Sequence, residues 1–172
     1  MYKLNQMLEY RDYLILQTDD IETALYYIFK SKETLDQIHG VGNYSTPEWE
    51  GNQRKIKYTL PLDYVPEIFQ FLIGGEQIKA KAKFAIEYTE NGAIVPIKII
   101  PKIIGSSLIK IKPIYIFTKQ SNKTIKMELY FKIKIYLPDD LQQKTESFIL
   151  LRMKEHIQNL KKSLEKQKIL IF

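Results

Sequence analysis

The chain has 172 residues, of which 45% are hydrophobic and 12% aromatic, and its formal net charge is +6. This length allows one domain with a sizeable core, and the hydrophobic fraction excludes a disordered chain. No segment reaches the roughly 20 consecutive apolar residues of a membrane-spanning helix. Without cysteine the chain holds neither disulfides nor thiolate metal sites. The N-terminus lacks the basic-then-apolar order of a secretory signal, so we expect an intracellular, cytoplasmic protein.

The positive charge comes almost entirely from lysine, because arginine occurs only at Arg11, Arg54 and Arg152. Sequence-specific nucleic-acid recognition relies on bidentate arginine contacts, so this basicity does not predict it. Two interpretations remain open. The lysines form a solvated surface in a biased composition, or they meet an anionic partner such as a membrane surface, an acidic protein or an RNA backbone.

The first forty residues predict one strand followed by two short helices. Residues 10–17 are typical of a strand, and Asp19-Asp20 offers a cap to a helix that begins at Ile21. A second helix is expected over residues 32–38, and it ends at His39-Gly40 because glycine commonly terminates helices.

Alternating strands occupy the middle of the chain. We expect a hairpin about Gly51-Asn52 that joins residues 42–50 to residues 53–62, and another about Asn91-Gly92. Residues 77–89 and 124–137 alternate apolar and polar side chains, and lysine dominates the polar face. About six antiparallel strands with one apolar face require a single covering layer.

A long C-terminal helix is the element that supplies this layer. Residues 139–168 contain neither glycine nor proline, and Asp139 and Asp140 supply N-cap chemistry and favourable negative charge at the start. Apolar residues recur at spacings of three and four on one stripe, namely Leu150, Met153, Ile157, Leu160 and Leu164.

This order of elements resembles the helix-grip fold of the START-like superfamily, also called SRPBCC or Bet v 1-like. Two stretches are similar to an uncharacterised bacterial SRPBCC family: PEWEGNQRKIKYTLPLDYVP with the following FLIGGEQIKAKAKFAIEY strand and Asn91-Gly92, and IKIYLPDDLQQKTESFILLRMKEHI. Trp49, Gly51 and RKIKYTLPL also resemble the sterol-binding VASt domains. The Gly-rich loop expected before the last helix is replaced by Pro138-Asp139-Asp140.

The resemblance implies a single α+β domain over residues 1–172, with residues 168–172 as an apolar tail. A curved antiparallel sheet of about six or seven strands would wrap the C-terminal helix and enclose an apolar cavity. No catalytic set of the superfamily matches residues of this chain, so no catalytic role carries over. We therefore expect a protein that is not an enzyme.

Aromatic, methionine and aliphatic side chains are expected to converge between sheet and helix. They are either ordinary core or, as the resemblance implies, the lining of a ligand cavity. The candidates are Tyr58, Phe84, Tyr88, Met127, Phe131, Met153, His156, Ile157 and Leu160.

We expect different roles for the two histidines. His156 either orients a polar ligand group or acts as an acid–base, or it is a boundary or surface residue. His39 is expected to end a helix whose dipole stabilises its cation. Since two histidines in separate elements cannot build a usual zinc site, we expect no metal and no cofactor.

The lysines of the polar strand faces are Lys55, Lys57, Lys79, Lys81, Lys83, Lys110, Lys112, Lys126, Lys132 and Lys134. They form one basic sheet face, which by default discourages edge-to-edge aggregation. The tail, Ile169 to Phe172, either folds back on the domain or inserts into a partner.

Three functions follow. The first is non-catalytic binding or transfer of a hydrophobic ligand of the lipid or sterol type. The alternative is a structural or accessory subunit with a filled core, which uses the lysine face and the apolar tail. The third is an enzyme of the cyclase or hydratase type with His156 as acid–base.

Overall fold

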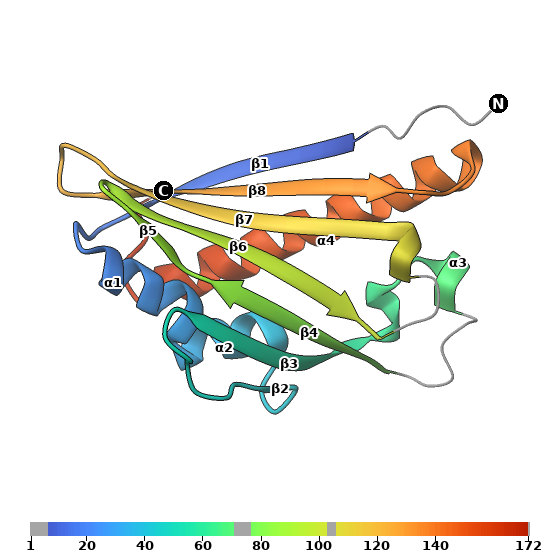
Figure 1. Ribbon diagram of the computed structural model, residues 1–172, viewed down its shortest axis with the longest axis horizontal. Coiled ribbons are helices and arrows are strands. Elements are labelled where there is room, and N and C mark those ends of the chain that lie inside the picture. Colours follow the sequence, from blue (N-terminus) through green and yellow to red (C-terminus); the bar gives the residue numbers. More distant parts are fainter. Residues whose placement is uncertain (1–6, 71–76, 103–105, 172) are drawn as a thin grey trace.

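The computed structural model describes residues 7–70, 77–102 and 106–171. A curved antiparallel sheet of eight strands packs over one long helix, and short helices follow the first strand (Figure 1). The strands are β1 (Met7–Leu16), β2 (Tyr44–Ser45), β3 (Gln53–Pro61), β4 (Gln77–Ala85), β5 (Glu87–Thr89), β6 (Gly92–Pro101), β7 (Ile109–Lys119) and β8 (Ile125–Ile135). Their order is β1-β8-β7-β6-β4-β3-β2, with β5 paired to β6.

The helical elements complete the predicted helix-grip architecture. They are α1 (Ile21–Leu25), the π-helix η1 (Tyr26–Lys30), α2 (Lys32–His39), the 3-10 helix η2 (Leu62–Tyr64), α3 (Glu67–Gln70), the 3-10 helix η3 (Ser106–Leu108) and α4 (Asp139–Lys166). The predicted α+β helix-grip fold is confirmed.

The sheet has more strands than expected because the predicted strand over residues 77–89 is divided into β4 and β5. The predicted strand over residues 42–50 is present but shortened to β2. The first arm of the Gly51-Asn52 hairpin forms a strand only at Tyr44 and Ser45, apart from an isolated bridge between Glu50 and Gln53. The predicted strand over residues 77–89 divides at Ile86, whose N–H donates to the carbonyl of Asn52 at 2.9 Å. The turn itself is present, since Glu50 and Gln53 exchange backbone hydrogen bonds around it.

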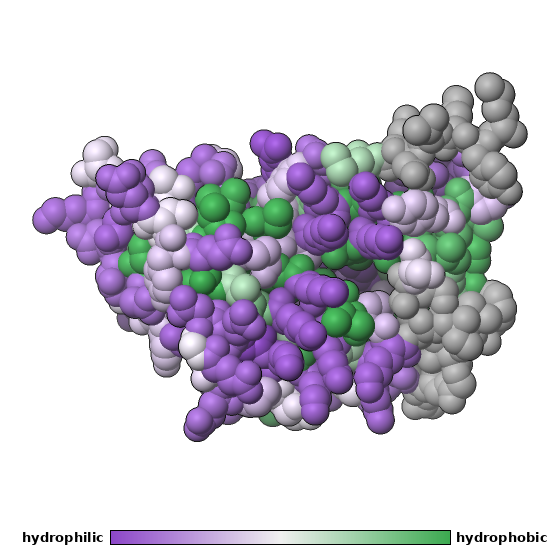
Figure 2. Space-filling model, viewed as in Figure 1, coloured by the Kyte–Doolittle hydropathy of each residue, from purple (hydrophilic) through white to green (hydrophobic). Residues whose placement is uncertain are grey.

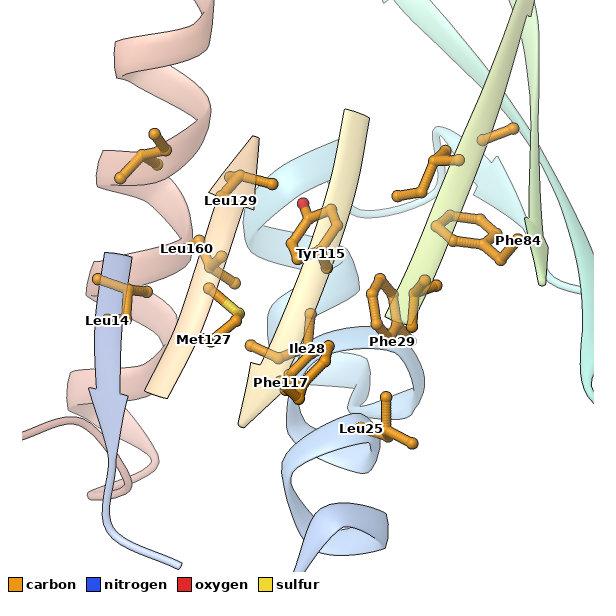
Figure 3. Packing of buried hydrophobic residues seen from close by; sticks show 14 of the residues in the cluster. Leu14, Leu25, Ile28, Phe29, Phe84, Tyr115, Phe117, Met127, Leu129 and Leu160 are labelled. Carbon is orange, nitrogen blue, oxygen red and sulfur yellow. The ribbon is translucent and has the colours of Figure 1, made fainter. Parts of the chain in front are cut away.

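The helical segment after β1 supplies the centre of the core. Asp20 caps α1 by accepting from the N–H of Thr23 at 2.8 Å, as the sequence predicted. The chain then continues as the π-helix η1, which the sequence did not predict. Phe29 of η1 lies edge-on to the rings of Phe84, Tyr115 and Phe117, with centroids 5.5, 5.1 and 6.1 Å away (Figure 3).

Helix α4 lies against the inner face of the sheet, with two corrections to the sequence prediction. Pro138 occupies the N-cap position, so Asp139 and Asp140 lie in the first turn and stabilise the helix through their charge alone. Ile149 is buried while Leu150 is half-buried, which shifts the start of the stripe by one residue. Its other members, Met153, Ile157, Leu160 and Leu164, are all buried.

The C-terminal tail folds back along β1. The N–H of Gln17 donates to the carbonyl of Ile169 at 2.8 Å, and the N–H of Ile171 donates to the carbonyl of Ile15 at 2.9 Å. Ile169 is buried in the core. Phe172 lies outside the described residues. The tail thus covers part of an edge strand that would otherwise offer unpaired backbone groups.

A buried polar network joins α2 to α4. The Oγ1 atom of Thr34 and the Oγ atom of Ser163 are 2.9 Å apart, and both residues are completely buried. Gln167 donates to Thr34 Oγ1 at 2.9 Å, and Thr34 Oγ1 also lies 2.6 Å from the carbonyl of Tyr27. The network fixes the position of α2 beneath the sheet.

Replacing Thr34 by valine is expected to lower the free energy of unfolding by about 1–3 kcal/mol. The shape is kept, but buried groups of Ser163 and Gln167 lose a partner. Urea unfolding followed by circular dichroism measures the loss. The control is Thr118→Val on the outer sheet face, where a change within about 0.5 kcal/mol is expected. Equal stability of the two variants would contradict a structural role for the network.

Candidate functional site

The inner face of the sheet is tightly packed at one end and less filled at the other. Near α1 and η1, inward side chains such as Leu16, Phe117 and Met127 are at most 2% exposed (Figure 3). Toward the end where α4 begins (Figure 1), Ile133 and Ile135 of β8 are buried, but several other inward side chains are only half-buried. They are Leu8, Tyr10, Leu60, Ile99, Ile109 and Ile111. A small cluster around Val65, Phe69 and Ile78 covers part of this end.

A tyrosine–histidine pair lies between the packed end and the open end. The hydroxyl of Tyr115 on β7 and Nε2 of His156 on α4 are 2.8 Å apart. The imidazole also lies edge-on to Phe131, 6.4 Å between ring centroids. His156 lies deep in the protein, yet its side chain is only half-buried.

A second histidine–tyrosine pair, His39 of α2 and Tyr58 of β3, lies near the first pair. The ring of His39 lies 4.8 Å from the ring of Tyr58 and 5.6 Å from that of Tyr44, centroid to centroid. Within residues 7–70, 77–102 and 106–171, neither the Tyr58 hydroxyl nor the His39 imidazole has a hydrogen-bond partner. His39 is close enough to His156 for the two imidazoles to repel each other when charged.

Burial sets the protonation states of these four rings. It lowers the pKa of His156 to about 4, and burial together with the charge of His156 lowers the pKa of His39 to about 4. Burial also raises the pKa of Tyr58 to about 12 and raises that of Tyr115. At neutral pH the site presents two neutral imidazoles and two phenols. The expectation of a helix-end cation at His39 is therefore wrong, because desolvation outweighs the helix dipole.

The predicted cavity residues separate into two groups. Phe131 contacts His156, and Met153 lies one turn earlier on the same helix, so both are placed beside the tyrosine–histidine pair. Phe84 packs on Phe29. Met127, Ile157 and Leu160 instead border a crevice against β1 that is too narrow for a water molecule. Those three belong to the packed core.

Tyr88 does not face the interior, contrary to the prediction. Its side chain is 49% exposed and its hydroxyl donates to Glu22 of α1. The residue lies in β5, which begins after β4 has ended at Ala85 and pairs only with β6. The alternating pattern continues through Ile86 in the sequence, but the strand does not.

The sequence did not identify Tyr115 as a site residue, and it did not show that His39 lies near His156. A signal for Tyr115 was present, because it alternates with Pro113 and Phe117 on the inward side of β7. A tyrosine in a buried strand usually needs a hydrogen-bond partner, which singles it out. The position of His39 depends on how α2 packs on α4, for which the sequence offers no local signal.

A separate concavity of about 380 Å³ lies on the surface between η2 and α4 and opens widely to solvent. Its most buried charge is Arg152, which bonds Glu155 at 2.7 Å and lies over the ring of Tyr64 at 4.4 Å. Among the described residues its Nε atom has no hydrogen-bond partner, but both terminal nitrogens are already engaged by Glu155 and the carbonyl of Asp63. This groove is therefore a weaker candidate site than the interior.

The described residues show no cluster of three metal-ligating side chains. In the same part of the chain, no helix is both long enough and apolar enough to cross a membrane.

No family model and no curated protein matches the sequence. The fold is similar to that of an aromatase/cyclase from Streptomyces, with a TM-score of 0.61 and 6% identity over 95% of this chain and 94% of that one. It is equally similar to a point mutant of norcoclaurine synthase from Thalictrum flavum in complex with a transition state analogue (TM-score 0.61, 13% identity, 96% and 99% coverage). A Thermus thermophilus protein gives a TM-score of 0.61 at 9% identity, with 93% and 99% covered. At these identities the likeness shows a shared helix-grip fold.

Proposed function

Starting from the helix-grip fold, we propose that this protein binds a hydrophobic small molecule of the lipid or sterol type between the sheet and α4. The observation that carries the proposal is the hydrogen bond between Tyr115 and His156 on the inner side of the sheet, near inward side chains that are only half-buried. A polar pair in such a place suits one polar group of an otherwise apolar ligand.

The chemistry of the four rings favours an uncharged polar group on the ligand. Neutral imidazoles offer one donor and one acceptor each, and a phenol offers both. The Tyr58 hydroxyl and the His39 imidazole have no partner among the described residues, so they are available to a ligand hydroxyl or carbonyl. A carboxylate would find no cationic ring there at neutral pH.

The apolar body of the ligand would lie toward the end of the sheet where α4 begins. Ile99, Ile109 and Ile111 are half-buried there and offer aliphatic surface. Met153 lies between this end and His156, and its flexible side chain adapts to different shapes.

Blocking the interior tests the proposal. Met153→Trp is expected to weaken binding of a hydrophobic ligand at least about tenfold, because the indole fills the space beside His156. The matched control is Leu151→Trp on the same helix, whose side chain is 52% exposed. Native mass spectrometry after gentle purification reports a co-purifying molecule, and the uncharged dye Nile red serves as a fluorescent probe. Thermal melts establish that both variants fold.

Retention of the co-purified molecule by Leu151→Trp and its loss from Met153→Trp would support the proposal. If the unmodified protein carries no molecule and binds no probe, the proposal fails. Equal binding by both tryptophan variants would place the ligand elsewhere.

An enzyme of the cyclase type is the second candidate, favoured by the paired acid–base groups. A neutral His156 accepts a proton from a bound substrate while Tyr115 holds the ring in place. Incubation of the co-purified molecule with fresh protein would reveal turnover by mass spectrometry. Turnover that persists in a His156→Gln protein would remove the only acid–base assigned to this role.

The alternative of a structural subunit receives less support. It relies on a filled core, the lysine-rich sheet face and the apolar tail, but the tail lies along β1 and Ile169 is buried. Association with a partner through the tail would require these contacts to break.

A further inference from the structure

Lysines project from the outer face of the sheet, opposite α4, and Figure 2 shows that much of this face is hydrophilic. Most of them lie directly opposite one another across the strands, although Lys132 also lies opposite Glu9 of β1. The cross-strand pairs are Lys55 with Lys83, Lys57 with Lys81, Lys83 with Lys98, Lys110 with Lys134, and Lys112 with Lys132. We call this set the lysine face.

This arrangement costs stability. Like charges directly opposite each other on antiparallel strands are destabilising. Within the described residues, none of the lysines of the lysine face forms an ion pair; the neighbouring Lys126 bonds Glu128 at 3.0 Å. Preventing aggregation at sheet edges requires charge on edge strands. Lys55 and Lys57 lie on β3, beside the short edge strand β2, but the other lysines lie on β4, β6, β7 and β8, inside the sheet. An anionic partner would relieve the repulsion.

Aliphatic side chains lie among the lysines on the same face. Ile94 on β6 is opposite Ile116 on β7, and both are half-buried, as are Ile100 and Ile114. Figure 2 shows hydrophobic patches between the hydrophilic side chains of this face. The surface therefore combines cations with apolar groups.

Lysine is depleted at protein–protein interfaces, and nucleic-acid recognition favours arginine. Clustered lysines beside apolar side chains instead suit a bilayer, whose anionic headgroups attract the cations while the interfacial region receives the apolar groups. We propose that the lysine face docks on the surface of an anionic lipid membrane.

Vesicle sedimentation tests this docking. The whole protein is expected to sediment with phosphatidylcholine vesicles that contain phosphatidylserine, but not with pure phosphatidylcholine vesicles. Higher salt should weaken the binding, because it screens exposed charges. A triple variant of the lysine face (Lys57→Gln, Lys81→Gln, Lys112→Gln) should bind at least about tenfold more weakly, since each lysine near an anionic surface contributes about 1 kcal/mol.

The control variant removes the same charge from exposed positions of α4, by Lys144→Gln, Lys154→Gln and Lys162→Gln. It is expected to retain binding. Thermal melts should show the triple variant of the lysine face to be no less stable than the original protein, because like-charge repulsion is relieved. If both triple variants bind the vesicles equally weakly, then the net charge of the protein and not the lysine face determines binding, and the proposal is overturned. The absence of vesicle binding, or binding of single-stranded RNA without vesicle binding, would also overturn it.

Discussion

Acidification from about pH 7 to about pH 4 is expected to lower the free energy of unfolding by about 2–5 kcal/mol through His39 and His156. Burial lowers the pKa of each imidazole to about 4 in the folded protein, against about 6.5 in an unfolded chain. Below about pH 6.5 the unfolded state binds protons that the folded state does not. The stabilisation is therefore complete above that pH and is lost as the pH falls toward 4. Because both rings are only half-buried, solvent screening reduces the loss below the full value of the shifts.

Urea unfolding at a series of pH values measures this effect. The matched variant is the double substitution His39→Gln and His156→Gln, in which no other histidine remains to titrate. Its stability should vary much less between about pH 4 and 6.5 than that of the original protein. Carboxylates do not obscure the comparison, because both proteins share them, including Asp20 and Asp36, whose pKa values are below the ordinary value. An unchanged slope in the double variant would place the acid sensitivity elsewhere.

The same protonation links stability to the ligand site. A proton on either imidazole would place a charge beside Tyr58 and Tyr115 in a partly desolvated interior. An apolar ligand is then expected to leave as the pH falls, together with the loss of stability. The proposed ligand binding is therefore expected to be strongest near neutral pH.

The general fold could be predicted because strand and helix periodicities are local properties of the sequence. The regular alternation of β8 and the uninterrupted pattern of α4 identify the sheet and its cover. Predictions that depend on one residue were less successful. The sequence predicts Leu150 in the stripe, whereas Ile149 is the buried residue; both fit a three- or four-residue spacing, and only packing against the sheet distinguishes them.

The candidate site was less predictable than the fold, since it is assembled from four separate elements. His156 was singled out by its place beside the apolar stripe. Its partner Tyr115 becomes evident only when β7 and α4 are packed together. His39 was identified at a helix end, but its neutral state depends on burial by β3 and α4. Periodicity predicts which face a residue occupies and not which residues meet across the interior.

The Asn91-Gly92 turn illustrates how a correct prediction rests on the wrong physical cause. The hairpin between β5 and β6 is present, with Thr89 paired to Gly92. The sequence signal implies a glycine with positive φ, but Gly92 does not have one. It is instead the first residue of β6 and pairs with Thr118 of β7.

Replacing Gly92 by alanine is therefore expected to destabilise the protein by more than about 3 kcal/mol, and to prevent soluble expression if total stability is ordinary. A Cβ atom at this position would lie 1.8 Å from the carbonyl oxygen of Phe117 and 2.8 Å from its carbonyl carbon. Both are backbone atoms, so no rotamer change relieves the contact. β6 and β7 would have to separate at the edge of the core, next to the completely buried Ala93.

Two comparisons distinguish close approach from backbone conformation as the cause. Gly42→Ala has open space around its Cβ but a φ of +78°, so it should cost only about 1 kcal/mol, the usual penalty of a left-handed residue. Gly92→Asn should be at least as damaging as Gly92→Ala, although asparagine tolerates positive φ better than other residues. The free energies of unfolding in urea give the order. If Gly92→Asn is close to the original protein in stability, then conformation rather than the packing of β6 on β7 selects glycine at this turn.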